Sequence, residues 1–371
     1  MPKLRVLVVD DAVVVRRLVS DALNADPEIE VCGTASNGKL ALELMLQVAP
    51  DAVTLDVEMP ELDGLSTLRE LRKKWPRLPV IMLSALTEKG ASVTLDCLSA
   101  GASGYVTKPT GVGNMAAAKE RVHSELAPMI KALCHRKLAA AAPAAGAPGT
   151  GAPRPTPTGP PRPHAPQPVL RTAEILAIGV STGGPNALAE LIPALPADLA
   201  VPVVIVQHMP PVFTRLLAER LASKSKVPVT EAMEGETLQP GHVYVAPGDF
   251  HMVLQRHGND VRISLNQEPP ENSCRPAVDP LFRSVSAIYG KRALGVVLTG
   301  MGRDGLRGCE VLREAGAQIL AQDEETSVVW GMPGFVARAG LADEVIPLAR
   351  VAAEIARRVV AKPIRLSGVH K

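Results

Sequence analysis

Apolar residues follow two spacings in the first third of the chain. Five short apolar runs predict buried strands, and they lie at residues 6–9, 29–34, 52–57, 80–83 and 104–107. Between several of them, and after the last, apolar positions recur with the spacing of a helix, as in 15–23, 38–48 and 122–133. Strands and helices that alternate in this way predict a doubly wound α/β fold, whose parallel strands are joined by right-handed crossovers.

The same alternation returns after residue 172. Strands are expected at 175–180, 203–206 and 294–298, and two or three further strand–helix units follow the last of these. Three short runs, at 242–246, 252–255 and 261–265, are separated by turn residues and predict short antiparallel strands. The second half is therefore expected to form another α/β sheet with a small β insertion.

Between the two halves, Ala139 to Pro168 is rich in Pro and Ala and has no acidic residue. Such a segment cannot bury a core, and its prolines favour an extended, semi-stiff spacer. A ligand for a proline-recognition domain is the alternative. We therefore divide the chain into a first domain at 1–137, a linker at 138–170 and a second domain at 171–364.

Composition narrows the class of protein. Hydrophobic residues make up 46% of the 371 residues but aromatic residues only 2%, so aliphatic side chains must form the cores, which suits parallel sheets buried on both faces. The net charge of +2 is too balanced to indicate a nucleic-acid or membrane-surface partner. Five cysteines without close pairing predict reduced thiols in a cytoplasmic protein. The short apolar run at the N-terminus is neither a signal peptide nor a membrane span.

Acidic residues occupy strand ends in the first domain. Asp10 and Asp11 end the first strand, and Asp56 ends the third. The carboxyl ends of parallel strands meet at one edge of a sheet, where three carboxylates need a cation, and their oxygen atoms suit Mg²⁺. Ser84 and Lys108 follow the next two strands, where a hydroxyl and an ammonium would hold a phosphoryl group on Asp56. A cis bond between Lys108 and Pro109 would aim the lysine into this site.

These residues resemble the receiver domain of response regulators. The resemblance covers residues 3 to about 125 and includes Val57-Glu58-Met59-Pro60 and Asp63-Gly64. It implies a flavodoxin-like sheet of five parallel strands and phosphotransfer from a histidine kinase to Asp56. Mg²⁺ would be bound by Asp11 and Asp56, with help from Asp10 and the backbone carbonyl of Glu58. Ser84 would be the switch hydroxyl, and Tyr105 the aromatic residue coupled to it.

A serine in the second domain lies in the pattern Gly179-Val180-Ser181-Thr182-Gly183. This G-x-S-x-G pattern follows a strand and precedes a helix, which is typical of a turn that exposes a nucleophilic hydroxyl. Taken alone, the pattern also fits a structural turn or a phosphate-binding glycine loop. The loop at 179–184 does not follow the pattern G-x-G-x-x-G, and a later acidic strand end is also missing, which disfavours a dinucleotide loop here.

A serine nucleophile needs a base and a group that orients the base. Of the eight histidines, His208 alone ends a predicted central strand of the second sheet, which places it beside Ser181. Asp304 follows another central strand in a glycine-rich turn, and Asp279 at a helix start is its chief rival. The order Ser, His, Asp differs from the Ser, Asp, His order of α/β-hydrolases.

The second segment resembles the catalytic domain of chemotaxis protein-glutamate methylesterases, the CheB family. The matching stretches are Gly-Val-Ser-Thr-Gly-Gly-Pro at 179–185, Gln-His-Met-Pro at 207–210, Tyr-Val-Ala-Pro-Gly at 244–248, Arg-Pro-Ala-Val-Asp at 275–279 and Gly-Met-Gly-Arg-Asp-Gly at 300–305. With the receiver-like segment, the resemblance covers nearly the whole chain except the linker.

The resemblance implies a role for each residue of the site. Ser181 is the nucleophile, His208 the general base and then acid, and Asp304 the orienting carboxylate. Thr182 supports the imidazole, and the backbone N–H of Met301 helps to hold the oxyanion. Arg275 is a candidate substrate contact. No cofactor is expected for the hydrolysis itself.

The implied reaction is hydrolysis of glutamate γ-methyl esters on chemoreceptors, together with deamidation of receptor glutamines. A chemotaxis histidine kinase would supply the phosphoryl group, and the unphosphorylated receiver is expected to lie across the serine site. Two alternatives stay open. A transcriptional or docking regulator is disfavoured because the second segment has no basic helix-turn-helix region. A hydrolase of small metabolite esters cannot be separated from a protein methylesterase by sequence.

Overall fold

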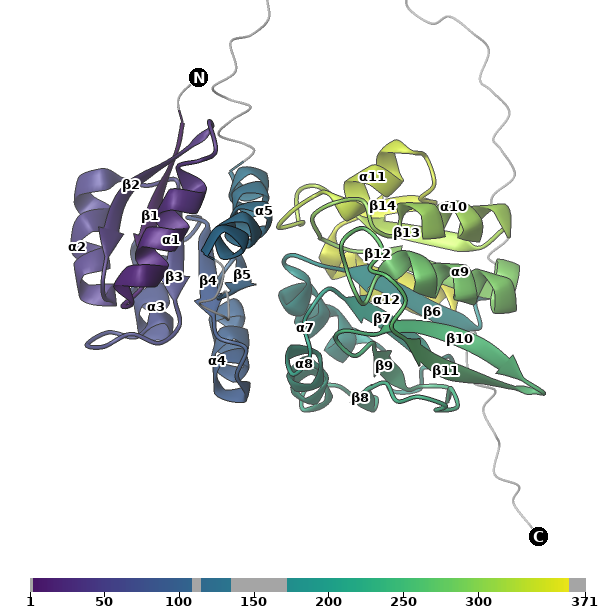
Figure 1. Cartoon of the computed structure of the whole chain (residues 1–371). Coiled ribbons are helices and arrows are strands. Elements are labelled where there is room, and N and C mark those ends of the chain that lie inside the picture. Colours follow the sequence, from purple (N-terminus) through teal and green to yellow (C-terminus); the bar gives the residue numbers. More distant parts are fainter. Residues whose placement is uncertain (1–2, 109–114, 135–171, 360–371) are drawn as a thin grey trace, which may run out of the picture.

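The computed structural model describes residues 3–108, 115–134 and 172–359, so the predicted linker, the Lys108–Pro109 bond and the C-terminal end lie outside the described residues. Figure 1 shows two α/β units side by side. Within the described residues, no helix is long and apolar enough to span a membrane.

The first unit is a sheet of five parallel strands in the order β2-β1-β3-β4-β5. The strands are β1 (Leu4–Val9), β2 (Ile29–Ala35), β3 (Ala52–Asp56), β4 (Val80–Ser84) and β5 (Gly104–Thr107). The helices are α1 (Val13–Leu23), α2 (Gly38–Val48), α3 (Gly64–Lys74), α4 (Glu88–Ser99) and α5 (Met115–Leu133). Helices α1 and α5 share an apolar core on one face of the sheet, and α2, α3 and α4 cover the other face. This is the doubly wound fold that the apolar runs predict.

The second unit contains a sheet of seven parallel strands in the order β14-β13-β12-β6-β7-β9-β8. They are β6 (Ile175–Val180), β7 (Val203–Gln207), β8 (Val229–Glu231), β9 (Val243–Val245), β12 (Ala293–Val297), β13 (Gln318–Gln322) and β14 (Glu344–Ile346). The strands β10 (His251–His257) and β11 (Asp260–Asn266) form a separate antiparallel hairpin.

Among the residues that the structure describes, six helices and one short 3-10 segment cover the second sheet. They are α7 (Gly184–Ala194), α8 (Phe213–Ala222), α9 (Val278–Tyr289), η1 (Gly290–Arg292), α10 (Leu306–Glu314), α11 (Met332–Arg338) and α12 (Leu348–Arg358). Helices α7, α8 and α12 pack on one face, and α9, α10 and α11 pack on the other. Both faces are therefore buried, which explains why the central strands are continuous apolar runs.

Two details of the second unit differ from the sequence prediction. The run at 242–246 was expected to be antiparallel, but β9 pairs in parallel with β7 and β8 inside the main sheet. Its three residues are fully buried, as an interior strand requires. Strand β8 was not predicted, because Val229-Thr230-Glu231 is too short and too polar to stand out.

The receiver-like unit contacts the second unit through α4 and β5. Helix α4 packs on α7 and α8, where Glu88 pairs with Arg215 at 2.9 Å and Asp96 pairs with Arg220 at 2.7 Å. The side-chain amide of Asn186 donates to the carbonyl of Leu98 at 2.8 Å. The first unit is therefore fixed against the helix that follows the serine turn.

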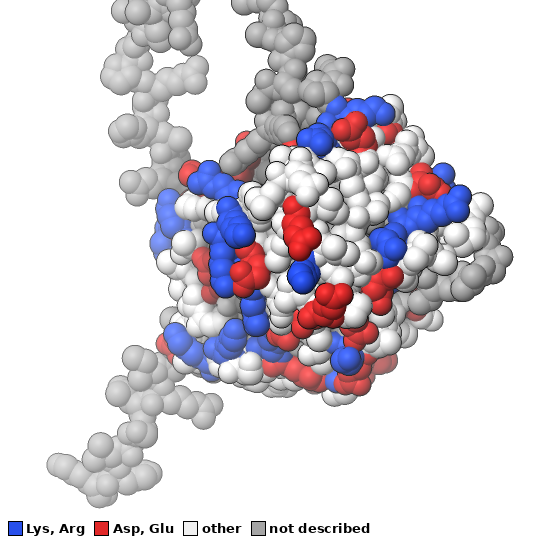
Figure 2. Space-filling model, turned by 90° about the vertical axis from the view of Figure 1, so that its left-hand side faces the viewer, with Lys and Arg blue, Asp and Glu red and all other residues white. Residues whose placement is uncertain are grey.

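The outer face of the receiver-like unit carries both signs of charge. Figure 2 shows basic and acidic side chains interspersed on that face rather than a continuous basic surface. Such a face offers no broad basic area to a phosphate backbone.

Candidate active site

Three strands of the second sheet bring Ser181, His208 and Asp304 to one edge. Ser181 follows β6, His208 follows the adjacent β7, and Asp304 lies in the turn after β12, on the other side of β6. After β6 the chain adds strands on one side of the sheet, and β12 begins the strands on the other side, so this is the topological switch point. The carboxyl ends of strands at such a point form the usual ligand crevice of an open α/β sheet.

The turn at Ser181 is held by its neighbours. The N–H of Ser181 donates to Thr299 at 3.0 Å, and its carbonyl accepts from Gly184 at 2.7 Å. Gly183 has a φ of 82°, and a side chain on Gly300 would come within 2.9 Å of Ser181 Cβ. The glycines of both motifs are therefore required by backbone geometry and close packing around the serine.

His208 and Asp304 form a buried pair. His208 Nε2 lies 2.7 Å from Asp304 Oδ2, and the Asp304 side chain is only 2% exposed. Burial alone would raise the pKa of Asp304, but the hydrogen bond and charge of His208 and the N–H groups of Val278 and Asp279 outweigh it and lower the pKa. Burial alone would lower the pKa of His208, but hydrogen bonds to Asp304 and Cys274 outweigh it and raise the pKa to about 10.

The second ring nitrogen of His208 faces a thiol that sequence reasoning missed. Cys274 Sγ lies 3.4 Å from His208 Nδ1. Both ring nitrogens thus have a partner other than Ser181, and no hydrogen bond joins Ser181 to His208 among the described residues. Cys274 directly precedes the Arg-Pro-Ala-Val-Asp motif, but nothing in the sequence indicates that it reaches the histidine.

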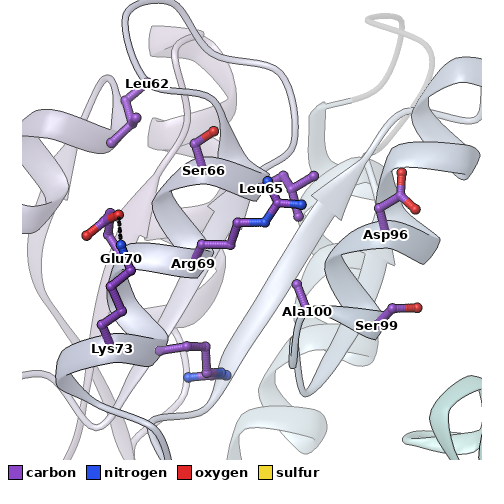
Figure 3. Close-up of a pocket in the computed structure, with 10 residues that line it drawn as sticks. Leu62, Leu65, Ser66, Arg69, Glu70, Lys73, Asp96, Ser99 and Ala100 are labelled. Atoms are coloured by element: carbon purple, nitrogen blue, oxygen red, sulfur yellow. Dashed lines mark hydrogen bonds and ion pairs between the residues drawn. The ribbon is translucent and has the colours of Figure 1, made fainter.

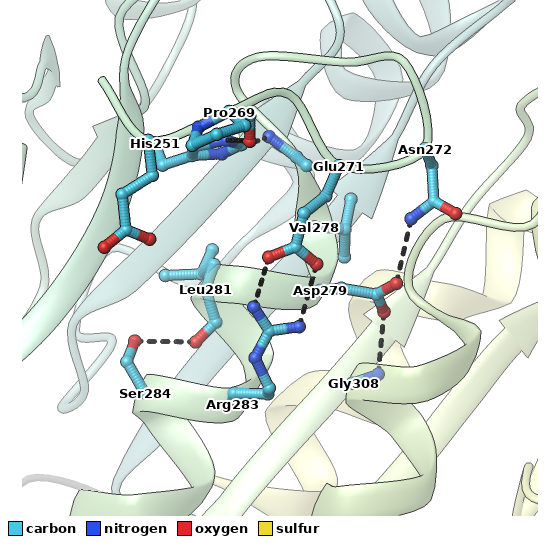
Figure 4. A network of polar contacts seen from close by, with 12 residues as sticks. His251, Pro269, Glu271, Asn272, Val278, Asp279, Leu281, Arg283, Ser284 and Gly308 are labelled. Carbon is cyan, nitrogen blue, oxygen red and sulfur yellow. Dashed lines mark hydrogen bonds and ion pairs between the residues drawn. The ribbon is translucent and has the colours of Figure 1, made fainter. Parts of the chain in front are cut away.

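Asp279, the alternative to Asp304, makes no contact with His208 among the described residues. Its side chain accepts from the N–H of Gly308 at 2.7 Å and from the side-chain amide of Asn272 at 3.0 Å (Figure 4). Burial raises the pKa of Asp279, and the nearby charge of Asp304 adds to the rise. The structure therefore pairs Asp304, not Asp279, with the imidazole.

The remaining residues of the predicted site have different surroundings. The methyl group of Thr182 faces Gly104 of β5, and the described residues provide no hydrogen bond from its hydroxyl to His208. The N–H of Met301 has no acceptor among the described residues. Arg275 is bound within the protein, with its guanidinium on Asp249 at 2.6 Å and on two backbone carbonyls. A substrate contact through Arg275 would require it to release these partners.

The acidic pocket of the receiver-like unit has formed as a cluster. Carboxylate oxygens of Asp10, Asp11 and Asp56 lie within 4.8 Å of one another. Lys108 Nζ lies 2.8 Å from Asp10 and 2.7 Å from Asp56. Burial raises the pKa of Asp56 to about 6; Lys108 opposes the rise and Asp10 adds to it. An all-oxygen donor set of this kind fits Mg²⁺.

Two other predicted residues of this pocket are Glu58, through its backbone carbonyl, and Ser84. The side chain of Glu58 pairs with Lys89 at 3.0 Å, and its N–H donates to Asp56 at 3.3 Å. Ser84 Oγ is fully buried and lies 2.6 Å from Thr94 Oγ1 of α4, so in this conformation the hydroxyl bonds to α4. A phosphoryl group on Asp56 would have to draw it away.

Neither of two hollows in the described residues is lined by Ser181 itself. One, of about 870 Å³, separates α3 from α4, with Arg69 and Asp96 on opposite walls (Figure 3). The other is a cleft of about 930 Å³ between the two units, lined by Met301 and Trp330 on one side and Arg77 and Pro79 on the other. Only the second hollow borders the candidate active site.

Comparison with known proteins finds two family matches in this chain. Residues 6–120 match the response regulator receiver domain, and residues 176–355 match the CheB methylesterase. A protein-glutamate methylesterase/protein-glutamine glutaminase of Trichodesmium erythraeum is 51% identical over 97% of this chain and 100% of its own length. One of Nocardioides sp. is 51% identical over 97% of this chain and 96% of its own length.

The crystal structure of the Thermotoga maritima CheB methylesterase catalytic domain is also similar to this chain. It shares 43% identity and covers 50% of this chain and 97% of its own, with a TM-score of 0.49. By its two matched domains and its near full-length relatives, the chain belongs to the family of protein-glutamate methylesterase/protein-glutamine glutaminases.

Proposed function

We propose that this chain is a phosphorylation-regulated serine hydrolase that removes methyl groups from glutamate γ-methyl esters of chemoreceptors and deamidates receptor glutamines. The observation that carries the proposal is the buried His208–Asp304 pair at the strand end beside Ser181. The arrangement provides a nucleophile, a base and a carboxylate that orients the base. The family to which the chain belongs supports the choice of ester and amide substrates.

Acylation begins with proton transfer from Ser181. Because Nε2 of His208 is bonded to Asp304, Nδ1 is the nitrogen that takes the proton of the serine hydroxyl. The serine oxygen attacks the ester carbonyl, and the tetrahedral intermediate then breaks its bond to the methoxy oxygen. His208 returns the proton to that oxygen, so methanol leaves and an ester of Ser181 remains. Cys274 has to give up its contact with Nδ1 for this step.

Deacylation repeats the same chemistry with water. His208 takes a proton from water, the hydroxide attacks the serine ester, and the proton passes to the departing Ser181 oxygen. The product is a glutamate carboxylate. With glutamine as substrate the first leaving group is ammonia instead of methanol, and the second half of the reaction is unchanged.

The oxyanion of each intermediate needs donors aimed at it. We assign this role to the N–H of Met301, which has no acceptor among the described residues. Thr182 is proposed to support the imidazole when the receiver-like unit moves, because its side chain now faces Gly104. The cleft beside Met301 is the proposed path for the methylated receptor segment.

We further propose that the receiver gates the esterase. Gly104 of β5 lies against Thr182, the residue next to Ser181, which supports occlusion of the site by the unphosphorylated receiver. A phosphoryl group on Asp56, supplied by a chemotaxis histidine kinase, would recruit Ser84 and Lys108. Ser84 would then leave Thr94 of α4, the helix that carries Glu88 and Asp96 of the interface. Phosphorylation would thereby weaken the docking of the receiver.

Mg²⁺ belongs to the proposed phosphorylation step only. Asp10, Asp11 and Asp56 would hold it, with the backbone carbonyl of Glu58 as a further ligand. The cation would neutralise the carboxylates and the incoming phosphoryl group. The proposed kinase and the receptor signalling helices place the reaction in the cytoplasm.

The experiment that tests this function is methanol release from methylated chemoreceptor membranes, with and without acetyl phosphate and Mg²⁺. We expect release that rises with the phosphodonor, is lost in Ser181→Ala, and stays at the basal rate in Asp56→Asn. Release that ignores the phosphodonor would refute receiver gating alone. Release from a small methyl ester but not from receptors would instead favour a metabolite esterase.

A further inference from the structure

One tight turn contacts both members of the His208–Asp304 pair. Glu271 and Cys274 exchange two backbone hydrogen bonds, of 3.1 and 2.9 Å, so the turn has two residues at its tip. These residues, Asn272 and Ser273, have φ values of 51° and 64°, in the left-handed region. Asparagine is among the few side chains that adopt this conformation readily. The turn is therefore a defined support for the side chains it carries.

Asn272 joins two buried carboxylates. Its Nδ2 lies 3.0 Å from Asp304 Oδ1 and 3.0 Å from Asp279 Oδ2. A side-chain amide has two N–H donors, so each carboxylate receives one. The exposed fractions of Asp304 and Asp279 are 2% and 1%, and two buried negative charges repel each other unless donors stabilise them. Asn272 thus holds the Asp304 carboxylate in place. It also lies between the negative charge of Asp304 and that of Asp279.

Cys274, at the end of the same turn, contacts the base. Its Sγ lies 3.4 Å from His208 Nδ1, on the opposite side of the ring from Asp304. The ring is therefore held at both nitrogens, by a carboxylate whose own position depends on Asn272 and by the thiol of Cys274.

Helix α9 fixes the turn in position. Arg283 of α9 forms a two-pronged ion pair with Glu271, the first residue of the turn (Figure 4). The N–H groups of Val278 and Asp279, at the start of the same helix, donate to Asp304. One helix therefore anchors both the turn and the carboxylate.

We propose that Asn272 and Cys274 are positioning residues for the esterase reaction: Asn272 holds the Asp304 carboxylate, and Cys274 holds Nδ1 of His208 until that nitrogen takes the serine proton. This inference rests on the proposed function of Ser181, His208 and Asp304. It adds two residues that neither the motifs nor the strand ends identify.

Asn272→Gly and Ser273→Gly form a matched pair of variants. Each removes one side chain from a left-handed position that glycine adopts without strain, but only the first removes the donor to Asp304. We expect kcat for methanol release to fall roughly ten- to hundredfold in Asn272→Gly, the size expected for losing a hydrogen bond to a charged group, with KM unchanged. Ser273→Gly should stay within about twofold of the parent.

The pH profile separates positioning from a general structural defect. The groups that face His208 are Asp304 and Cys274, and behind them lie Asp279 and Arg283. Loss of Asn272 leaves Asp304 a stronger base, so the acidic limb of kcat/KM should move to higher pH. Cys274→Ala removes a contact that raises the pKa of His208, so the acidic limb of kcat/KM in this variant should move to lower pH. Cys274→Ser keeps a hydrogen-bonding group and should lie closer to the parent.

The assay uses the full chain and methylated receptor membranes, with Ser181→Ala as the blank. If the parent chain releases no more methanol than this blank, the proposed function fails. If the parent is active but Asn272→Gly matches Ser273→Gly in kcat and in pH profile, the positioning role of Asn272 is overturned while the function stands. An unmoved profile in Cys274→Ala overturns the role of Cys274. Active-site titration counts the reactive Ser181 hydroxyls in each variant. A lower count without a shift in the pH profile shows a folding defect, and it also counts against positioning.

Discussion

The ring of Tyr105 in the receiver-like unit stacks on the ring of Phe213 in the second unit, with centroids 4.8 Å apart and planes 5° apart. Phe213 begins α8 and is fully buried, and Tyr105 lies three residues before Lys108. Lys108 bridges Asp10 and Asp56. A single short segment therefore contacts both the proposed phosphorylation site and the domain interface.

Removal of this stack should release the esterase. Aromatic pairs contribute about 0.5–1.5 kcal/mol beyond the area that they bury, so Tyr105→Ala should raise basal methanol release by up to about tenfold. Tyr105→Phe keeps the ring and serves as the control. If Tyr105→Ala leaves the basal rate unchanged while acetyl phosphate still activates, the stack does not contribute to gating.

The ion pair between Arg220 and Asp96 offers a charge-reversal test. The pair is 2.7 Å long, with side chains 25% and 48% exposed, so we expect it to contribute only about 0.2–1 kcal/mol to docking. Arg220→Asp should raise the basal rate about two- to fivefold, and adding Asp96→Arg should restore the parent rate. A double variant as active as Arg220→Asp would contradict the contact. Higher salt should also raise the basal rate of the parent.

The contact between Thr94 and Ser84 predicts a more responsive receiver. Thr94→Val keeps the shape of the side chain but removes the hydroxyl that lies 2.6 Å from Ser84 Oγ. A neutral hydrogen bond of this kind is worth about 0.5–1.5 kcal/mol, so half-maximal activation should need roughly two- to tenfold less acetyl phosphate. An unchanged phosphodonor requirement would mean that Ser84 does not have to leave α4.

Asparagine substitutions test which of the two carboxylates, Asp304 or Asp279, orients His208. Asp304→Asn should lower kcat by roughly 10³- to 10⁴-fold, because the imidazolium loses its partner. Asp279→Asn, which has no contact with His208, should cost far less. Protonated His208 cannot accept the serine proton, so the raised pKa of His208 predicts a kcat/KM that increases with pH above the usual histidine range. In Asp304→Asn this limb should move to lower pH, and equal losses in both variants would contradict the assignment.

The fold is largely predictable from the sequence because parallel strands buried on both faces are continuous apolar runs. This holds for β6, β7 and β12, and therefore for the strand ends that carry Ser181 and His208. It fails for β8, because a strand of three residues has too few positions to show a period, and it does not reveal the parallel pairing of β9. Their place in the main sheet is set by long-range pairing, because β9 pairs with β7 and β8 pairs with β9.

Site residues that directly follow a strand can be predicted from the sequence. Site residues that belong to a turn away from the strand ends cannot. Ser181, His208 and Asp304 each follow a sheet strand, and motifs mark all three. Asn272 and Cys274 come from a turn whose position depends on the ion pair of Arg283. The dipeptide Asn272-Ser273 indicates a turn, but sequence alone does not reveal which side chains that turn will contact.

The buried carboxylate of Asp56 should make the folding stability of the chain depend on pH and on Mg²⁺. Burial raises its pKa from 3.8 to about 6 in the folded chain. Ionisation is therefore harder in the folded than in the unfolded state, so the stability that this group contributes is complete below about pH 4 and is lost as pH rises through about 6. Asp56→Asn removes the ionisation, so its melting temperature should exceed that of the parent at pH 7.5 and approach it near pH 4. The difference corresponds to at most about 3 kcal/mol, and the pKa of about 6 from which it follows already includes the opposing effect of Lys108.

Mg²⁺ should stabilise the parent more than Asp56→Asn. A cation among Asp10, Asp11 and Asp56 favours the ionised carboxylates, so it should raise the melting temperature of the parent at pH 7.5 and have much less effect on Asp56→Asn. Calorimetry of the full chains with and without millimolar Mg²⁺ measures this directly. Asp63→Asn changes a nearby carboxylate that caps α3 and provides the control. An equal effect of Mg²⁺ on parent, Asp56→Asn and Asp63→Asn would show that the cation binds outside the predicted pocket.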